Sequence, residues 1–200
     1  KKKIYLIKNE NININNIQKP KSLTNRKKIK IGYFGLISDK FGGYRDINIL
    51  YKALKNNGYL KDKLVFEFYG DSNIKNQEIL NFKPFKFYKG LDYFEARKKM
   101  NNMDYLLIIH TEKKTGKEVI TGKFYDYVAS KAPILSVTEG QIEANKLIKK
   151  YKLGITINYQ NNNLTESLKK IVKKKYKRKP ININNFSRSY QNKTLFKILN

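Results

Sequence analysis

Apolar residues along the chain follow two alternating patterns, which together predict a mixed α/β fold. Six short apolar runs, bounded by glycine, proline or polar residues, are typical of buried strands. These runs span residues 29–35, 64–69, 85–88, 104–109, 133–137 and 153–157. Between most of the runs, apolar residues recur every three or four positions, which indicates helices with one buried face.

The predicted helices combine this spacing with recognisable start signals. They cover residues 46–57, 92–103, 121–130, 141–151, 163–175 and 183–199. Asp46 and Asp92 stand where an N-cap side chain would accept a hydrogen bond from the first turn. Strands that alternate with helices favour a parallel sheet covered on both faces. The predicted fold class is therefore α/β, a doubly wound, Rossmann-like parallel sheet of about six strands that binds ligands at the carboxyl ends of its strands.

Two terminal segments differ from the domain predicted over residues 28–180. Residues 1–27 are polar, rich in asparagine and lysine, and contain Pro20, which indicates a linker and the edge of a preceding domain. Residues 181–200 are expected to form a closing C-terminal helix. No apolar run approaches the roughly 20 residues that span a bilayer, and no signal-peptide pattern opens the chain. We therefore expect a cytoplasmic protein.

The charge of the chain has two interpretations. Lysine and arginine number 43 against 16 acidic residues, a net charge of +27, which would suit nucleic acid, an anionic membrane or anionic ligands. However, lysine, asparagine and isoleucine are enriched together, as an A+T-rich genome would produce. The lysine-rich run 169–179 is accordingly interpreted as a solvated helix face and a loop. Arginine is scarce, and it is the better residue for forked phosphate recognition, so Arg45 stands out.

The chain contains no cysteine, and His110 is its single histidine. Disulfides, thiolate metal sites and cysteine nucleophiles are therefore excluded, and a zinc site or a histidine triad is disfavoured. No metal and no cofactor is expected. His110 follows an apolar run, and we interpret it as a loop histidine without a role, with contact to a bound ligand as the alternative.

The first candidate site follows the first predicted strand. Gly35 would let the backbone approach a ligand closely, and Arg45 precedes a helix at the carboxyl edge of the sheet, where it could neutralise a diphosphate. The segment matches neither the P-loop nor the dinucleotide fingerprint. A plain turn with a surface arginine remains the alternative.

The second candidate site lies where the helix 121–130 begins. Amides at Thr121, Gly122 and Lys123, together with the helix dipole, favour phosphate, and Lys123 adds a charge. Glu118 and Asp126 stand on either side of this turn, and carboxylates accept well from ribose and sugar hydroxyls. Two ordinary surface acids would fit the spacing equally.

The segment from Gly122 to Pro133 resembles the signature of family 4 retaining glycosyltransferases of the two-domain GT-B type. There, Lys-x-x-Glu-Tyr-x-Ala-x-Gly-x-Pro opens a helix and leads into a strand, and Glu118 and Asp126 fall where that family has its Glu-x7-Glu motif. Weaker matches recur in order over residues 28–175. The resemblance implies the carboxy-terminal, donor-binding half of an enzyme that transfers a sugar from a nucleotide-sugar such as a UDP- or GDP-sugar, without a metal.

The resemblance also implies roles for individual residues. Arg45 and Lys123 would neutralise the donor diphosphate, and the amides of Thr121, Gly122 and Lys123 would hold its oxygens. The remaining roles concern the sugar and the nucleoside: Glu118 would face the donor sugar, Asp126 would bind the ribose, and Gly90 and Leu91 would lie beside the base. Two residues depart from the family pattern, because Asp126 is one methylene shorter than glutamate and Lys131 stands where the family has glycine.

At the level of the family, the acceptor would be a glycan or a lipid-linked sugar in surface polysaccharide biosynthesis. The basic surface would suit peripheral association with the inner face of an anionic membrane, and nucleic acid is not the expected partner. The isolated fragment is expected to be inactive, since the acceptor-binding domain would be missing. The alternatives are a basic nucleic-acid-binding module, a sugar epimerase of related shape and a non-catalytic scaffold.

Overall fold

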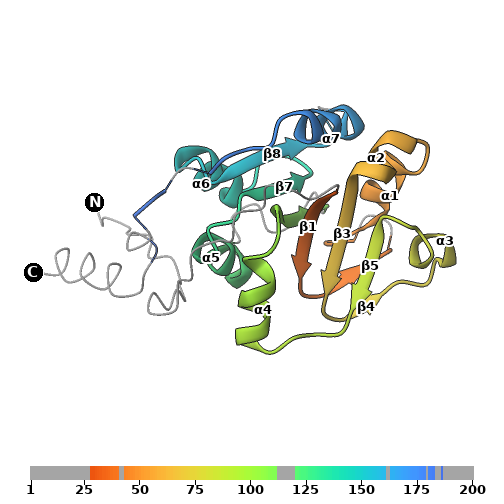
Figure 1. The fold of residues 1–200 in the computed structure, drawn as a ribbon, viewed down its shortest axis with the longest axis horizontal. Coiled ribbons are helices and arrows are strands. Elements are labelled where there is room, and N and C mark those ends of the chain that lie inside the picture. The colour runs from red at the N-terminus through yellow and green to blue at the C-terminus, as the bar shows by residue number, and fades with distance from the viewer. Residues whose placement is uncertain are drawn as a thin grey trace, which may run out of the picture.

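A six-stranded parallel sheet forms the centre of the molecule in a computed structural model (Figure 1), which describes residues 28–40, 43–111, 120–160, 163–178, 180–182 and 186. The strands are β1 (Ile29–Phe34), β3 (Leu64–Tyr69), β5 (Phe85–Tyr88), β6 (Tyr105–His110), β7 (Ile134–Thr138) and β8 (Gly154–Asn158). Their order is β5-β3-β1-β6-β7-β8, and every neighbouring pair is parallel. The predicted fold class is confirmed. The strand order reverses between β1 and β6.

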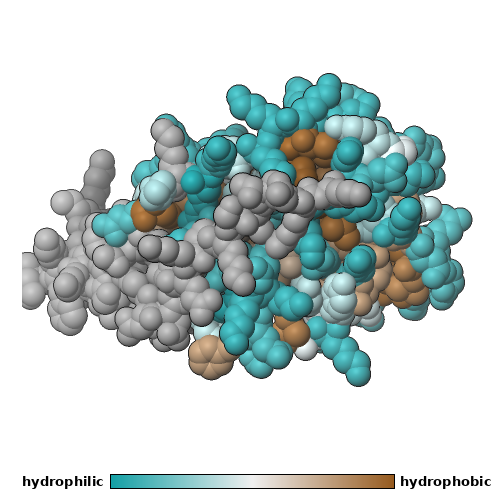
Figure 2. Space-filling view, viewed as in Figure 1, coloured by the Kyte–Doolittle hydropathy of each residue, from teal (hydrophilic) through white to brown (hydrophobic). Residues whose placement is uncertain are grey.

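Helices cover both faces of the sheet and bury an apolar cluster on each. One cluster packs under α1 (Asn48–Leu54), α2 (Gly58–Lys63), α3 (Gln77–Leu80) and α7 (Leu164–Lys173). The other packs under α4 (Tyr93–Met100), α5 (Gly122–Ala129) and α6 (Glu143–Lys150). The strands β3, β6 and β7 are buried along their whole length, as expected when both faces are covered. The surface in Figure 2 is mostly hydrophilic, with apolar side chains in separate patches.

Helix and strand boundaries differ from the predictions mainly where segments are short. The predicted helix 46–57 corresponds to α1 alone, which ends at Leu54. The helix α2, which was not predicted, begins at Gly58, and Asn57 caps it by accepting a hydrogen bond from the Leu60 amide. The four-residue α3 and the paired strands β2 (Ile37–Ser38) and β4 (Ser72–Asn73) were not predicted. Elements of two to four residues are too short to produce a readable periodicity.

The two predicted N-caps have different outcomes. Asp92 does cap α4, and its Oδ1 accepts from the Glu95 amide at 2.9 Å. Asp46 lies one residue too early, because the N-cap position of α1 is Ile47. The Asp46 carboxylate still accepts from the Asn48 amide at 2.8 Å, so it supports the start of the helix from outside.

The terminal segments are largely outside the described residues. Residues 1–27 are not described, and of residues 181–200 only 181, 182 and 186 are. Phe186 belongs to the second apolar cluster, and its ring centroid lies 4.9 Å from that of Tyr151. Within the described ranges, no helix is long and apolar enough to cross a membrane.

Lys131 adopts a left-handed backbone conformation, with φ of 65°, directly after α5. Such a conformation favours glycine, because a Cβ crowds the following carbonyl. We expect Lys131→Gly to raise the free energy of unfolding by about 1 kcal/mol in urea titrations. Lys149→Gly, an exposed helical position in α6, is the control and should lower it by about 1 kcal/mol. Equal losses at both positions would contradict the prediction.

Candidate functional site

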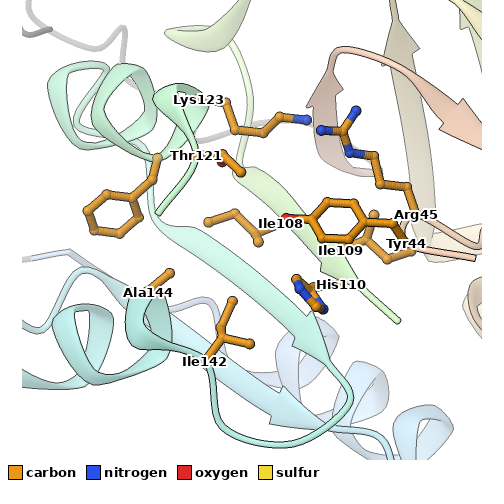
Figure 3. A pocket seen from close by; sticks show the side chains of 10 residues that line it. Tyr44, Arg45, Ile108, Ile109, His110, Thr121, Lys123, Ile142 and Ala144 are labelled. Atoms are coloured by element: carbon orange, nitrogen blue, oxygen red, sulfur yellow. The ribbon is translucent and has the colours of Figure 1, made fainter. Parts of the chain in front are cut away.

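A crevice opens at the point where the strand order reverses. β1 pairs with β3 through all six of its residues but with β6 only at Ile31–Tyr105 and Gly32–Leu106. The carboxyl ends of β1 and β6 therefore separate, which is where doubly wound sheets bind ligands. A pocket lies there, and the side chains around it come from the turn before α1, the end of β6, and the starts of α5 and α6. These residues include Tyr44, Arg45, His110, Thr121, Lys123, Ile142 and Ala144 (Figure 3).

Two cationic side chains meet in this pocket. Arg45 and Lys123 point toward one another from opposite sides (Figure 3). The Lys123 ammonium lies 3.9 Å from the centre of the Tyr33 ring, and Arg45 Nη1 donates to the Leu36 carbonyl at 3.5 Å. Among the described residues, no carboxylate lines the pocket. Two positive charges held together in this way favour an anion between them.

The environment of Lys123 is unfavourable for a cation. Burial lowers the pKa of Lys123 to about 7, and the positive charge of Arg45 acts in the same direction. The Tyr33 ring offsets only part of this cost, because a cation–π contact is weaker than an ion pair with an anion. An anionic ligand would supply the missing counter-charge and would raise the pKa of Lys123 again.

The first turn of α5 adds hydrogen-bond donors to the same wall. Thr121 occupies its N-cap position, and the Thr121 side chain makes no capping hydrogen bond. The first amides of a helix have no partner within it, and with the helix dipole they form a ready site for phosphate. Thr121 and Lys123 both line the pocket, whereas Gly122 is exposed.

Three glycines form a row along the carboxyl edge from β1 to β5. Gly35 and Gly70 have φ of 127° and 133°, values that side chains rarely tolerate. A Cβ on Gly70 would lie 2.8 Å from the Gly35 carbonyl oxygen, and one on Gly90 would lie 3.9 Å from the Gly70 Cα. A Cβ on Gly35 would lie 3.0 Å from the Lys123 ammonium. The missing side chains therefore let the backbone at these three strand ends pack closely, with the Lys123 ammonium beside Gly35.

His110 is not in a loop, and that interpretation was wrong. It is the last residue of β6, is 2% exposed, and its ring centroid lies 4.4 Å from that of Tyr44. The uninterrupted apolar run before His110 could have indicated that the strand extends one residue further, to His110 itself. Tyr44 was missed for a different reason, since nothing in its neighbourhood indicates which strand end it would contact.

The other predicted site residues that the structure describes do not line this pocket. Glu118 lies outside the described residues. Burial raises the pKa of Asp126, and the charge of Arg97 in α4 opposes this shift. Leu91 is partly buried against the second cluster. No group of three or more histidine, aspartate or glutamate residues that could hold a metal is found in the described ranges.

Comparison with known proteins supports the fold but not a family assignment. No family model and no curated protein matches the chain. Among solved structures it is similar to WaaG, a glycosyltransferase involved in lipopolysaccharide biosynthesis, with a TM-score of 0.54 at 15% identity over 75% of this chain and 39% of that chain. The lipopolysaccharide outer core galactosyltransferase WaaB matches with a TM-score of 0.50 at 12% identity, over 98% and 55% of the two chains.

The described residues form a Rossmann-like domain that matches one part of these GT-B proteins. The same fold occurs in the UDP-GlcNAc 2-epimerase of Methanocaldococcus jannaschii, in complex with UDP-GlcNAc and UDP, with a TM-score of 0.52 at 13% identity over 86% of this chain and 46% of that chain. This chain therefore spans about two-fifths to just over half the length of each of these three proteins. At such low identities the likeness concerns the fold alone.

Proposed function

We propose that this chain is the nucleotide-sugar-binding domain of a retaining glycosyltransferase, and that the crevice between β1 and β6 binds the donor diphosphate. The observation that carries this proposal is the convergence of Arg45 and Lys123 in one pocket, where no carboxylate is found among the lining residues that the structure describes. Arg45 and Lys123 are 78 positions apart in the sequence, and both side chains line this pocket. Glycosyltransferases among the structural neighbours support the proposal at the level of the fold.

Each part of the site has a place in this proposal. The diphosphate lies between Arg45, Lys123 and the first amides of α5. The nucleoside follows the glycine row, with the base beside Gly90 and Leu91 and the ribose at Asp126. Glu118 stays a prediction from the family resemblance for the donor sugar. As the bond to the sugar breaks, negative charge grows on the leaving diphosphate, and the two fixed cations stabilise it.

An epimerase is the second candidate, because one structural neighbour is a UDP-GlcNAc 2-epimerase. It would use the same diphosphate site but would also need acid and base groups around the sugar. Among the described residues that line the pocket, Lys123 has a pKa lowered to about 7, which would suit such proton exchange near neutral pH. Transfer of sugar to an acceptor and epimerisation of UDP-GlcNAc are distinguished by their products.

The proposed donor site is tested by thermal shift with UDP, GDP, ADP and inorganic pyrophosphate. A ligand at 100 times its dissociation constant should stabilise the native state by about 2.7 kcal/mol, or about 5–10 °C for a domain of this size. Arg45→Ala should remove most of the shift, whereas Lys63→Ala, an exposed position on α2, should not. A salt-dependent shift with oligonucleotides alone would favour the nucleic-acid alternative, and no shift with any ligand would favour a scaffold.

A further inference from the structure

The turn that carries Arg45 is attached to two different elements. On one side, residues 45–47 bond to β2: the Ser38 amide donates to the Arg45 carbonyl at 3.2 Å and the Ile47 amide to the Ser38 carbonyl at 2.9 Å. On the other side, the turn contacts the residue that follows β6. The first attachment shapes the turn, and the second sets its position across the crevice.

That second attachment is made by Thr111. The Thr111 amide donates to the Tyr44 carbonyl at 3.2 Å. Its hydroxyl accepts from the Asp46 amide at 3.0 Å and donates to the Gly43 carbonyl. Arg45 lies between these contact points, so Thr111 holds the backbone on both sides of it. Thr111 is 3% exposed, so water cannot readily replace these bonds.

We propose that Thr111 is a positioning residue that holds Arg45 at the distance from Lys123 that a diphosphate requires. The inference rests on the proposed function and adds a residue that touches neither the ligand nor the other cation. The chemistry explains why a hydroxyl is needed. A hydroxyl can accept from one backbone group and donate to another through a single atom, which an apolar side chain of the same shape cannot do, and the β-branch of threonine restricts χ1.

The position in the fold explains why such an attachment is required. β1 and β6 share only two paired positions, at Ile31–Tyr105 and Gly32–Leu106, and separate beyond them. Ladder hydrogen bonds therefore do not fix the separation of the two strand ends. Thr111 bridges the crevice above the last paired residues, between the end of β6 and the turn that follows β1 and β2.

The test compares Thr111→Val with Thr111→Ser by titration with inorganic pyrophosphate, which contains the diphosphate and no base or sugar. Thr111→Val should weaken binding about tenfold, as loss of a residue that orients a ligand-binding group does at metal sites. Thr111→Ser keeps the hydroxyl and should stay within about threefold of the wild type.

Two further variants separate positioning from a general loss of stability. Thr165→Val removes a hydroxyl that donates to the Ala53 carbonyl at 2.9 Å on the α1–α7 side of the sheet, and it should lower the melting temperature without changing affinity. In an Arg45→Ala background, Thr111→Val should have little further effect, within about twofold. If Thr111→Val does not fold, Thr111→Ala takes its place as the variant without a hydroxyl, and its binding is measured below its melting temperature.

The outcomes distinguish the two proposals. If the wild type binds pyrophosphate and Thr111→Val binds equally well, the positioning role is overturned and the donor site stands. If Thr111→Val weakens binding by the same factor with and without Arg45, Thr111 acts independently of Arg45 and the inference is again overturned. If the wild type shows no pyrophosphate binding, the proposed function and the inference fall together.

Discussion

Lys123→Met is expected to weaken pyrophosphate binding by about 10–100-fold at pH 7 and, at the same time, to raise the melting temperature. The loss of affinity follows from removing a charge-assisted bond to the ligand, worth about 1.5–3 kcal/mol. The gain in stability follows because the ammonium is held where burial and Arg45 both disfavour it. A methionine of similar length fills the same space without that cost. Opposite signs for affinity and stability would mark Lys123 as a binding residue.

The pH dependence of stability and of pyrophosphate binding provides an independent test of the role of Lys123. The pKa of Lys123 is lowered from 10.5 to about 7 in the folded protein. Between these values the unfolded chain binds the proton more tightly, so stability should rise with pH across that window relative to Lys123→Met. Binding should change in the other direction. Above pH 7, Lys123 in the ligand-free site increasingly loses its proton. The affinity for pyrophosphate should therefore fall by up to about tenfold for each pH unit between pH 7 and pH 9.

Lys123→Arg is the matched control for both measurements. Arginine stays protonated throughout this range, so the pH dependence of its binding reports the titration of the ligand alone. Isothermal titration with pyrophosphate at pH 7, 8 and 9 would then isolate the contribution of the lysine. A wild-type profile that runs parallel to that of Lys123→Arg would show that Lys123 does not titrate in the site.

The sequence predicted the parts of the site that are local. Short apolar runs followed by glycine located β1, β3 and β5. Burial on both faces accounts for the nearly continuous apolar pattern of β3, whereas β5 is an edge strand with exposed positions. Arg45 and Lys123 were singled out from strand ends and a helix start, and the structure places both in one pocket. Their meeting could be anticipated only through the doubly wound topology, which brings carboxyl ends of separate strands to one edge.

The parts that were missed depend on which elements become neighbours. Thr111 and Tyr33 have no special pattern around them, and their importance follows from contacts with Gly43, Asp46 and Lys123. Pairings between residues tens of positions apart cannot be read from the periodicity of a single segment. The lysine-rich run 169–179 was interpreted as solvated, which describes its exposed lysines but not Arg178, which is partly buried.

Arg178→Ala is expected to lower the free energy of unfolding by about 3 kcal/mol. The guanidinium donates to the carbonyls of Tyr127, Val128 and Ala132 at 3.2, 2.8 and 3.1 Å. Two of these carbonyls, those of Tyr127 and Val128, lie in the last turn of α5, where the helix dipole favours a cation. They also accept locally, from the Ser130 hydroxyl at 2.9 Å and the Lys131 amide at 3.4 Å. Without the guanidinium, each of the three carbonyls loses a hydrogen-bond donor. The segment after α7 that carries Arg178 also loses these bonds to the end of α5.

Burial opposes part of this effect, since it lowers the pKa of Arg178 to about 10. Removing a desolvated cation returns some free energy, which is why the expected loss is about 3 kcal/mol and not the sum of three charge-assisted bonds. Urea unfolding would measure it, with Lys177→Ala at an exposed neighbouring position as the control, expected within about 0.5 kcal/mol of the wild type. Arg178→Lys keeps the charge but cannot span three carbonyls, so it should recover less than half of the loss. Full recovery by lysine would mean that the charge at the end of α5, and not the fork of hydrogen bonds, holds this segment in place.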